Sequence, residues 1–424
     1  MYKKIASILL TSVLLSLLLT GCGSSATPDS PTPSADSSKS GKVSLEVWGS
    51  EEDEALINEI IKSFKAEYSG QADFDITFEA HSEANCKDNV LGDVLNAPDV
   101  FTFADDQLMV LVASGVLKEV KNSSAISSRN LKAASDAASV GGKLYAYPLT
   151  ADNGYFLFYN KAYLSDSDVQ TMDRILEVAA SKGKQVYMDI TSGWYLYSFF
   201  GNTDMEIGLK DDGLNTYCNW NAKYTSITGK DVAEALVKLG KNKAFTATTT
   251  DSFTKSAAND VFIAGVSGIW DESAIKEAWG SNYAATKLPT YTVAGKQLQL
   301  SSYAGYKLVG VNSYSENFDW ASVFADWMTN EKNQTLRFEM RGQGPSNTNS
   351  SHVGAVAESK ALQALQKQAE FSSLQRVGST YWGPSGTFGS VMNEGNPSGK
   401  DLQALLNEMV YGITGVETTG DAPQ

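Results

Sequence analysis

An α/β fold is the architecture that the sequence predicts for most of this chain. Val43, Leu45 and Val47 alternate with polar residues, as in a half-buried strand. Apolar residues then recur at helical spacing over 56–68, and a second alternation covers 74–78. Strand, helix and strand in this order form a βαβ unit, which predicts a parallel sheet with right-handed crossovers.

The next segments continue the same alternation of strands and helices. Asp53 is suited to cap the first helix, because a carboxylate accepts from free N–H groups at a helix start. Gly115 is a natural left-handed stop for a later helix. The expected elements are a helix over 83–95, a strand over 100–103, a helix over 106–114, and strand-like runs over 143–148 and 155–160 separated by a polar loop over 150–154.

After Tyr159 the pattern starts afresh, which predicts a second α/β lobe. The expected elements are a helix over 172–181, a strand over 185–190, a helix over 193–200, a long helix over 318–340, helices over 356–371 and 401–410, and a frayed tail over 414–424.

The N-terminal end combines a short basic stretch, an apolar run over 8–19 that is too short to span a bilayer comfortably, and small residues before a cysteine. Leu19-Thr20-Gly21-Cys22 resembles the lipobox of bacterial lipoproteins. We therefore expect 1–21 to be a cleaved signal peptide and Cys22 to be acylated, so that its lipid chains hold the protein to a membrane. A plain secretory signal with a coincidental cysteine is the alternative.

The segment 22–41 is almost entirely Ser, Pro, Thr, Ala, Gly and Asp. Such a composition buries too little apolar surface to offset chain entropy, so we expect a disordered tether between the anchor and a folded head. The head is long enough for two domains.

Charge and composition exclude several function classes. The formal net charge is −15, which argues against nucleic acid and an anionic membrane surface as binding partners. With only His81 and His352 as histidines, no zinc pattern is present, and we expect both on the surface or in loops. Cys86 and Cys218 make no disulfide framework; pairing outside the cell is conceivable, but two buried free thiols are favoured.

No nucleophile elbow, dinucleotide fingerprint, phosphate-binding loop or calcium loop is found. Paired carboxylates for glycoside cleavage stay open, because they are set by fold and not by local spacing. No cofactor or metal is expected.

A set of short segments resembles, in its order, the extracellular solute-binding proteins of sugar ABC transporters, and most closely their maltose and maltodextrin type. The resemblance spans about 42–412. Its segments are Lys42-Val43-Ser44-Leu45-Glu46-Val47-Trp48, Ala97-Pro98-Asp99-Val100-Phe101, Ala113-Ser114-Gly115-Val116-Leu117, Gly142-Lys143-Leu144-Tyr145-Ala146-Tyr147-Pro148, Leu157-Phe158-Tyr159-Asn160-Lys161, Gly268-Ile269-Trp270, Lys287-Leu288-Pro289-Thr290 and Trp327-Met328-Thr329-Asn330-Glu331.

The resemblance implies a two-lobed, periplasmic-binding-protein-like fold with a hinge and a ligand cleft between the lobes. The first lobe would contain 42–151 and 305–341, and the second 152–304 and 345–413, with 414–424 as a flexible tail. This division suits α/β sheets, whose ligands sit outside the carboxyl ends of strands.

Sugars require aromatic rings for their C–H faces and planar polar groups for their hydroxyls. By resemblance, Trp194, Trp270 and Trp382 stand at sugar-stacking positions, and Asp106 and Asn153 at hydroxyl-binding ones. Trp320 and Trp327, seven residues apart on an apolar helical face, read instead as core. The full set of candidate ligand residues is Ser50, Glu51, Glu52, Asp106, Asp152, Asn153, Tyr155, Trp194, Tyr195, Trp270, Tyr381 and Trp382.

Three positions depart from the family pattern and leave the identity of the sugar open. Gln107 and Gly386 stand where arginines are familiar, and Asn153 replaces a glutamate. Asp105 and Asp106 also have a simpler reading, as caps of the following helix.

The expected function is a monomeric, non-enzymatic lipoprotein on the outer face of the cytoplasmic membrane, in the Gram-positive manner. It would capture an oligosaccharide, with malto-oligosaccharides the first choice, and present it to the permease subunits of an ABC importer. The alternatives are a protein of the same fold that binds another sugar or a non-sugar solute such as a peptide or polyamine, and a polysaccharide-acting enzyme.

Overall fold

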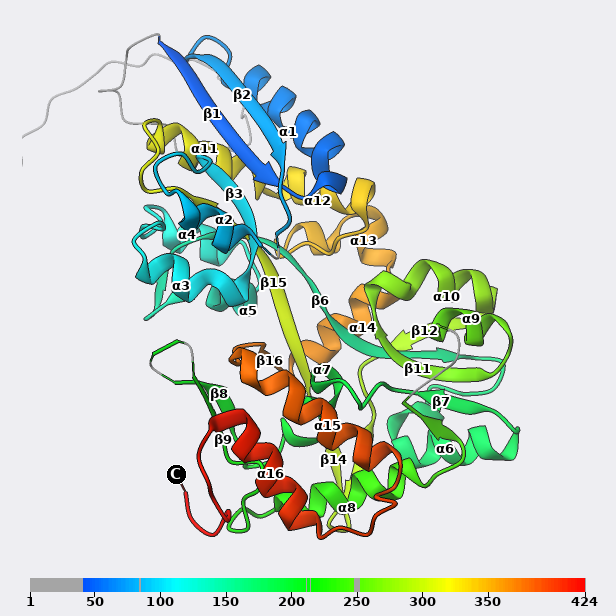
Figure 1. Ribbon diagram of the computed structural model, residues 1–424. Coiled ribbons are helices and arrows are strands. Elements are labelled where there is room, and N and C mark those ends of the chain that lie inside the picture. The colour runs from blue at the N-terminus through cyan, green and yellow to red at the C-terminus, as the bar shows by residue number, and fades with distance from the viewer. Residues whose placement is uncertain (1–40, 84, 211, 214, 248–251, 424) are drawn as a thin grey trace, which may run out of the picture. The chain divides into compact units, whose positions relative to one another are not determined.

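The computed structural model describes residues 41–83, 85–210, 212–213, 215–247 and 252–423, so the expected signal peptide, Cys22 and nearly all of the tether lie outside the described residues. A ten-stranded mixed sheet forms the framework (Figure 1). Its strands are β1 (Lys42–Gly49), β2 (Asp73–Ala80), β3 (Val100–Ala104), β6 (Tyr147–Asn160), β7 (Gln185–Tyr187), β10 (Phe245–Thr246), β11 (Phe262–Gly268), β12 (Tyr283–Thr286), β15 (Ser302–Val311) and β16 (Ser372–Leu374). Neighbouring strands follow the order β10-β7-β11-β6-β15-β3-β1-β2, with β12 beside β6 and β16 beside β15.

Helices and three small two-stranded sheets complete the fold. The helices are α1 (Glu54–Glu67), α2 (Cys86–Gly92), α3 (Leu108–Ala113), α4 (Ser123–Ser128), α5 (Lys132–Ala137), α6 (Met172–Ser181), α7 (Gly193–Phe200), α8 (Gly229–Gly240), α9 (Phe253–Ala258), α10 (Glu272–Trp279), α11 (Phe318–Met328), α12 (Glu331–Arg341), α13 (Gly354–Glu358), α14 (Lys360–Ala369), α15 (Trp382–Asn393) and α16 (Leu402–Thr414). The small sheets pair β4 (Ser139–Val140) with β5 (Lys143–Leu144), β8 (Ile207–Leu209) with β9 (Thr216–Cys218), and β13 (Thr290–Val293) with β14 (Lys296–Gln299).

The buried apolar residues divide into two large cores and a smaller one. The first core draws its residues from 43–149 and 306–328. The second core runs from Tyr155 to Ile413 in sequence and lies around α6, α7, α8, α15 and α16. A third core packs Phe156 and Phe158 against α9, α10 and α14. The second α/β pattern predicted after Tyr159 therefore builds a hydrophobic core of its own.

The predicted βαβ unit is present in the first core. β1 and β2 pair in parallel from Lys42 opposite Asp73 to Gly49 opposite Ala80, and β3 lies parallel on the other edge of β1. Phe64 of α1 packs edge-on against Phe324 and Trp327 of α11, with ring centroids 5.0 and 6.2 Å apart. Trp327 and Trp320 are therefore packing residues, as their helical spacing indicated.

β6 and β15 are the two strands shared by both large cores (Figure 1). The polar loop expected over 150–154 is wrong, because β6 continues through these residues as one strand of 14 residues. Its polar stretch pairs with β15, Asn153 opposite Gly305 and Gly154 opposite Ala304, across two irregularities of register. The backbone groups that a loop would expose to water are thus satisfied by a strand 150 positions away in sequence.

Two expectations about helices need correction. The helix expected over 318–340 is two helices, because Asn330 leaves the helical conformation and its side chain accepts from the N–H of Asn333 to start α12. Asp53 does not cap α1 with its side chain. It is instead 1% exposed and forms an ion pair with Arg337, 2.5 Å away, and a second with Arg341 at 2.8 Å.

Segments after α12 differ from the expected lobe division. Ser346 accepts from the N–H of Leu131, and the N–H of Thr348 donates to the carbonyl of Arg129, so 346–348 lies with the first core although it was assigned to the second lobe. The tail expected to fray lies against the body, where the carbonyl of Gly420 accepts from the N–H of Lys223.

Cys86 and Cys218 are buried free thiols, as predicted. Burial raises the pKa of each thiol to about 12, so neither is reactive at neutral pH. His352 is exposed at the end of a short 3-10 helix, and His81 lies in the loop after β2, where its ring stacks on Trp48 with centroids 3.6 Å apart. Among the described residues, no helix is both long enough and apolar enough to cross a membrane.

Candidate functional site

The start of α7 and the start of α15 lie together in the second core. Ser192 accepts from the N–H of Trp194 at 3.3 Å and so caps α7. The hydroxyl of Tyr381 donates to the carbonyl of Gly193 at 2.7 Å, and any side chain larger than hydrogen at Gly193 would collide with Ser385 of α15. This close approach brings the chain at Trp194 near the chain at Trp382.

Trp194, Trp270 and Trp382 differ in how much of each ring is exposed. Trp270 follows β11 in a short 3-10 turn and is 53% exposed. Trp194 and Trp382 are half-buried, and both pack against the second core. The Trp194 ring lies 5.5 Å from Tyr155 and 5.6 Å from Tyr303, so its inner side is already used for packing.

Tyr155 and Tyr381 are core residues, which corrects their candidacy as ligand contacts. Both are 0% exposed. The Tyr155 hydroxyl lies 2.8 Å from the carbonyl of Trp194 and 3.0 Å from Ser198 Oγ, and it accepts from the N–H of Tyr303. Their role is to support the rings beside them, because no surface of either remains for a solute.

Tyr195 of α7 lies beside Ser267 at the end of β11. Burial raises its pKa, as do the nearby charges of Asp271 and Asp189. The Ser267 hydroxyl in turn donates to Asp271 at 2.5 Å, and Thr191 donates to Asp189 through its N–H and hydroxyl. Sequence reasoning missed Asp189 and Asp271; the available signal was that each closely follows a strand of a parallel pair.

We call Trp194, Tyr195, Trp270 and Trp382 the aromatic rim. The first core carries a different set, which we call the acidic rim: Ser50, Glu51, Glu52 and Asp106. Ser50, Glu51 and Glu52 follow β1, and Asp106 follows β3, so all four lie at the carboxyl edge of two neighbouring parallel strands. The Ser50 hydroxyl donates to Glu52 at 2.6 Å, and this bond lowers the pKa of the Glu52 carboxyl.

Asp105 and Asp106 are adjacent but differ in burial. Asp105 is buried, and one oxygen accepts from the N–H of Tyr306 at 2.8 Å, while the other has no partner among the described residues. Burial, reinforced by the charge of Asp106, raises the pKa of Asp105 to about 7. Asp106 is exposed to solvent, yet desolvation by the surrounding protein still raises its pKa. Neither side chain caps the following helix.

Gln107, which stands where the family pattern has an arginine, holds the loop before α2. Its amide nitrogen donates to the carbonyl of Glu83, and its amide oxygen accepts from the N–H of Lys87. It is neutral and buried, so it presents neither the charge of an arginine nor much polar surface to solvent.

A cavity of about 560 Å³, the Trp270 cavity, lies where β6 and β15 pass between the cores. Its walls bring Trp270 together with Asp152 and Asn153 of β6. The further lining residues are Ile269, Glu272, Ser273, Lys276, Lys307, Arg341, Gly342 and Gln343. The sequence prediction thus grouped three of its candidates correctly in space, but it missed Lys307 and Arg341, which carried no local motif.

Charged groups around the Trp270 cavity are paired. Lys307 pairs with Glu83, Lys276 with Glu272 at 2.9 Å, and Arg341 with Asp53 at 2.8 Å. Burial tends to raise the pKa of Asp53, but the charges and hydrogen bonds of Arg337 and Arg341 outweigh this effect and lower it.

Asp152 is buried, and burial raises its pKa although its carboxylate accepts from the N–H of Gly344 at 2.9 Å. Asn153 is exposed and has no side-chain hydrogen bond among the described residues.

Arg337 anchors the wall below this cavity. It is 1% exposed, and besides Asp53 it donates to the Gln343 side chain at 2.7 Å. Arg337 and its partners therefore hold the charged and polar side chains of this wall in place beside the exposed Trp270 ring. No group of three or more potential metal ligands occurs in the part of the chain that the structure describes.

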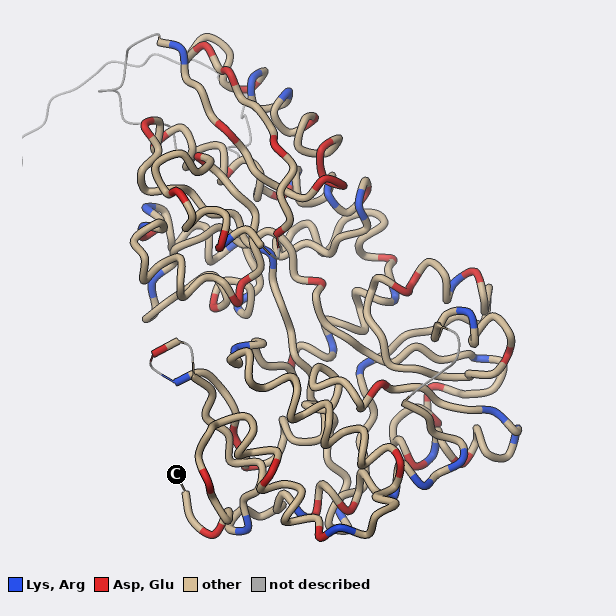
Figure 2. The backbone as a smooth tube through the Cα atoms, viewed as in Figure 1, with Lys and Arg blue, Asp and Glu red and all other residues tan. Residues whose placement is uncertain are grey.

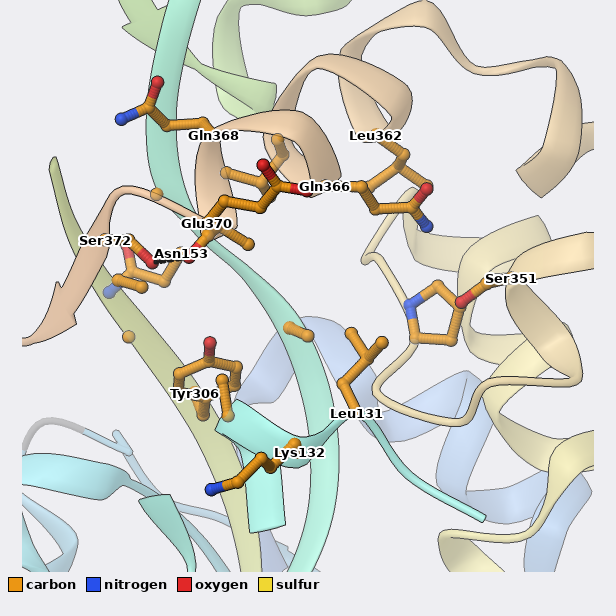
Figure 3. Close-up of a pocket in the computed structure, with 18 of the residues that line it drawn as sticks. Leu131, Lys132, Asn153, Tyr306, Ser351, Leu362, Gln366, Gln368, Glu370 and Ser372 are labelled. Carbon is orange, nitrogen blue, oxygen red and sulfur yellow. Dashed lines mark hydrogen bonds between the residues drawn. The ribbon is translucent and has the colours of Figure 1, made fainter. Parts of the chain in front are cut away.

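A second cavity, of about 680 Å³, also reaches β6 and β15. Among the candidate ligand residues, only Asn153 lines it. Tyr306 of β15 projects into it, and we call it the Tyr306 cavity (Figure 3).

The sequence is similar to those of two binding proteins of known ligand class. One is 26% identical over 88% of this chain and 87% of its own length, a galactooligosaccharide-binding protein of Bacillus subtilis. Another is 25% identical over 87% of this chain and 86% of its own, a maltooligosaccharide ABC transporter solute-binding lipoprotein of Streptococcus pneumoniae.

Solved structures show the same fold. A maltodextrin-binding protein of L. casei, solved without ligand, superposes with a TM-score of 0.76 at 22% identity, covering 88% of this chain and 99% of the other. A solute-binding protein of Staphylococcus aureus in complex with maltose gives 0.73 at 21% identity, covering 88% and 97%. The fold is therefore the two-lobed, hinged one expected. The family model for bacterial extracellular solute-binding proteins matches residues 59–364, and the chain belongs to that family.

Proposed function

We propose that this protein is a lipid-anchored extracellular receptor that captures an oligosaccharide and delivers it to the permease subunits of an ABC importer. Malto-oligosaccharides are the first choice of ligand. The relatives named above for galacto- and maltooligosaccharides support the class of ligand, and the second is also named as a lipoprotein.

The observation that carries the proposal is the exposed Trp270 ring beside a cavity walled by Asp152, Asn153 and paired charges. An exposed indole is a platform for the C–H face of a sugar, and the oxygen and nitrogen atoms beside it suit the hydroxyls. Trp194, Tyr195 and Trp382 extend the platform. Ser50, Glu51, Glu52 and Asp106 supply acceptors from the first core.

Ligand capture requires only that the sugar bind the closed arrangement of the lobes better than the open one. Aromatic contacts from one lobe and polar contacts from the other are both made only when the lobes approach. Binding then shifts the population toward closure, as in other hinged binding proteins. For the lobe boundaries, we propose 42–151 with 305–341 and 346–348 as the first lobe, and 152–304 with 349–413 as the second.

The rival proposal is an enzyme that cleaves polysaccharide. The carboxylates of the acidic rim and Asp152 would then transfer protons, whereas a receptor needs them only as hydrogen-bond acceptors. We favour the receptor because the related proteins are binding proteins.

A ligand panel tests the proposal. Purified protein from residue 42 onward is titrated with malto-, galacto-, xylo- and manno-oligosaccharides by calorimetry, and its melting temperature is followed in parallel. A tight ligand raises the apparent stability by mass action. We expect one sugar series to bind without being hydrolysed. Release of reducing ends would contradict the receptor, and binding of a peptide or polyamine in place of every sugar would contradict the ligand class.

Membrane anchoring is tested separately. Replacing Cys22 with Ser should move the full-length protein from the membrane fraction to the medium, because the acyl chains provide the attachment. Unchanged fractionation would contradict the lipoprotein assignment. Sedimentation of the soluble head should give a monomer.

A further inference from the structure

The Tyr306 cavity is built from elements on both sides of the shared strands. α5 contributes Leu131 and Lys132 at its start, β15 contributes Tyr306, and α14 contributes Leu362. Its volume of about 680 Å³ is larger than that of the Trp270 cavity. A pocket of this size is in the range that holds small molecules.

Small residues on the shared strands let neighbouring side chains pack closely against the floor of this cavity. A methyl group at Gly154 would lie 2.7 Å from the Leu365 side chain, and one at Gly305 would lie 2.4 Å from the amide of Asn153. Ala151 and Ala304 complete the floor. These small residues add little side-chain volume to the floor. The cavity lies between Leu131 and Leu362 on one side and the polar side chains of Asn153, Tyr306 and Glu370 on the other (Figure 3).

Tyr306 presents an unused polar group to this space. The Tyr306 side chain is largely buried, with the residue 6% exposed, and its hydroxyl has no hydrogen-bond partner among the described residues. Figure 3 shows the hydroxyl directed into the cavity, on the same side as Asn153 and Glu370. Solvent reaches this hydroxyl and no group of the described residues pairs with it, so it is free to pair with a ligand group that enters the cavity.

The charge of the lining favours a cation over an anion. Glu370 is exposed at the end of α14 and forms no ion pair within the described ranges, although Lys287 lies close enough to interact with it electrostatically. Lys287 itself donates to Gln299. Lys132 pairs with Asp136 at 2.5 Å, and Figure 3 shows its ammonium directed away from the cavity.

We propose that the Tyr306 cavity binds a small primary ammonium ion with an apolar body. The ammonium group lies between the Glu370 carboxylate and the Tyr306 hydroxyl, and the apolar body lies along Leu131 and Leu362. Asn153 contributes its amide oxygen as a further acceptor. This site lies outside the aromatic rim and shares only Asn153 with the Trp270 cavity, and its test uses no sugar.

The test uses three probes of one shape and different charge: n-hexylammonium, n-hexanol and n-hexanoate. Each is titrated into sugar-free soluble head at pH 8, where the amine is charged. We expect one site that takes the amine about tenfold more tightly than the alcohol, and the hexanoate most weakly. Equal affinity for amine and alcohol would overturn the proposal.

Variants separate this site from general attraction of a cation to an acidic protein. Glu370→Gln should lower the affinity for the amine about tenfold and remove its advantage over the alcohol. Glu358→Gln removes the same charge from the end of the neighbouring α13, outside the lining, and should leave the affinity unchanged. Equal losses in the two variants would show non-specific attraction and contradict the site.

Tyr306→Phe provides a second, independent measurement. Because the hydroxyl has no partner, its removal should leave the melting temperature unchanged while lowering amine affinity about threefold. An unchanged affinity for the amine in this variant would contradict the placement of the ammonium group. Folding of all three variants is checked by near-ultraviolet circular dichroism.

Discussion

The turns beside the first core and the turns beside the second core carry different kinds of side chain at equivalent places. Beside the first core, the chain that leaves β1 and β3 presents Glu51, Glu52 and Asp106, whereas beside the second core the corresponding turns present indole and phenol rings. Both sets lie where strands end or helices begin. The same arrangement, a strand followed by a helix, thus places carboxylates that accept hydrogen bonds beside the first core and flat aromatic rings beside the second. A sugar needs both kinds of contact.

The distribution of acidic residues does not follow the division between the two rims. Figure 2 shows acidic residues along the segments that build both large cores rather than gathered in one region. Net charge therefore does not distinguish the two rims. What distinguishes them is which side chains the ends of the strands carry.

The largest expected effect comes from Trp220, the buried tryptophan beneath the aromatic rim. Its ring stacks on Phe200 with centroids 4.2 Å apart and contacts Tyr381 edge-on at 5.8 Å. Trp220→Ala should lower the free energy of unfolding by about 3–5 kcal/mol, because a large cavity is left in the second core. Chemical denaturation measures the change. Trp270→Ala, which removes an exposed ring, is the matched control and should change stability by less than about 1 kcal/mol.

The next effect concerns the adjacent pair Asp105 and Asp106 and is a dependence on pH. Asp105 keeps its proton up to about pH 7 in the folded protein, whereas an unfolded aspartate loses it near pH 3.9. Between these values the folded state binds more protons, so stability should fall as pH rises, by at most about 1.4 kcal/mol per pH unit, and level off above pH 7.

Asp105→Asn should remove this slope and make the protein more stable than the wild type at pH 8. Unfolding is followed by urea titration at pH 5, 6, 7 and 8. The exposed neighbour serves as the comparison, since Asp106→Asn should preserve most of the slope. An identical slope in wild type and Asp105→Asn would assign the dependence to another group.

Binding of sugar should separate the aromatic rim from the core. Trp194→Ala, Trp270→Ala and Trp382→Ala should each weaken oligosaccharide binding by about 1–3 kcal/mol, the scale of a lost aromatic contact. Calorimetry and melting temperature on the same samples distinguish the roles. If all three variants melt far lower and bind normally, the rings are packing residues and the rim is wrongly assigned. If only Trp382→Ala weakens binding, the site is smaller and a mono- or disaccharide is the better ligand.

The smallest effect is expected in the acidic rim. Asp106→Asn should weaken oligosaccharide binding by about 1 kcal/mol, the value of one exposed hydrogen bond to a charged acceptor, and leave stability nearly unchanged. Glu59→Gln on the outer face of α1 is the control for charge. A loss of affinity in both variants would point to long-range electrostatics rather than to contact.

Local patterns predicted the regular elements of this chain well. The helices over 172–181 and 193–200 have the predicted bounds, because a capping side chain and the apolar spacing both mark their ends. β1, α1 and β2 followed from alternation and helical spacing alone. Gly115 ends its helix region with a φ of +78°, as a left-handed stop requires.

Non-local pairing explains what the sequence could not predict. The polar run 150–154 looks like a loop until β15, far away in the chain, supplies its hydrogen bonds. Asp53 looks like a cap until Arg337 approaches it. The prediction of Tyr155 as a ligand residue fails for the same reason, since nothing near it in sequence shows that Trp194 and Tyr303 enclose it. The aromatic rim itself was grouped through resemblance, because its members come from three separated segments.

The continuity of β6 and β15 has a consequence for how the protein unfolds. Leu149 of β6 and Leu308 of β15 lie in the first core, while Tyr155 and Tyr303 of the same strands lie in the second. Neither core can melt without releasing strands that the other requires, so the two should lose structure in one cooperative transition despite the size of the chain. Backbone amides of these strands should exchange with deuterium only through global opening, and thus be the slowest in the molecule.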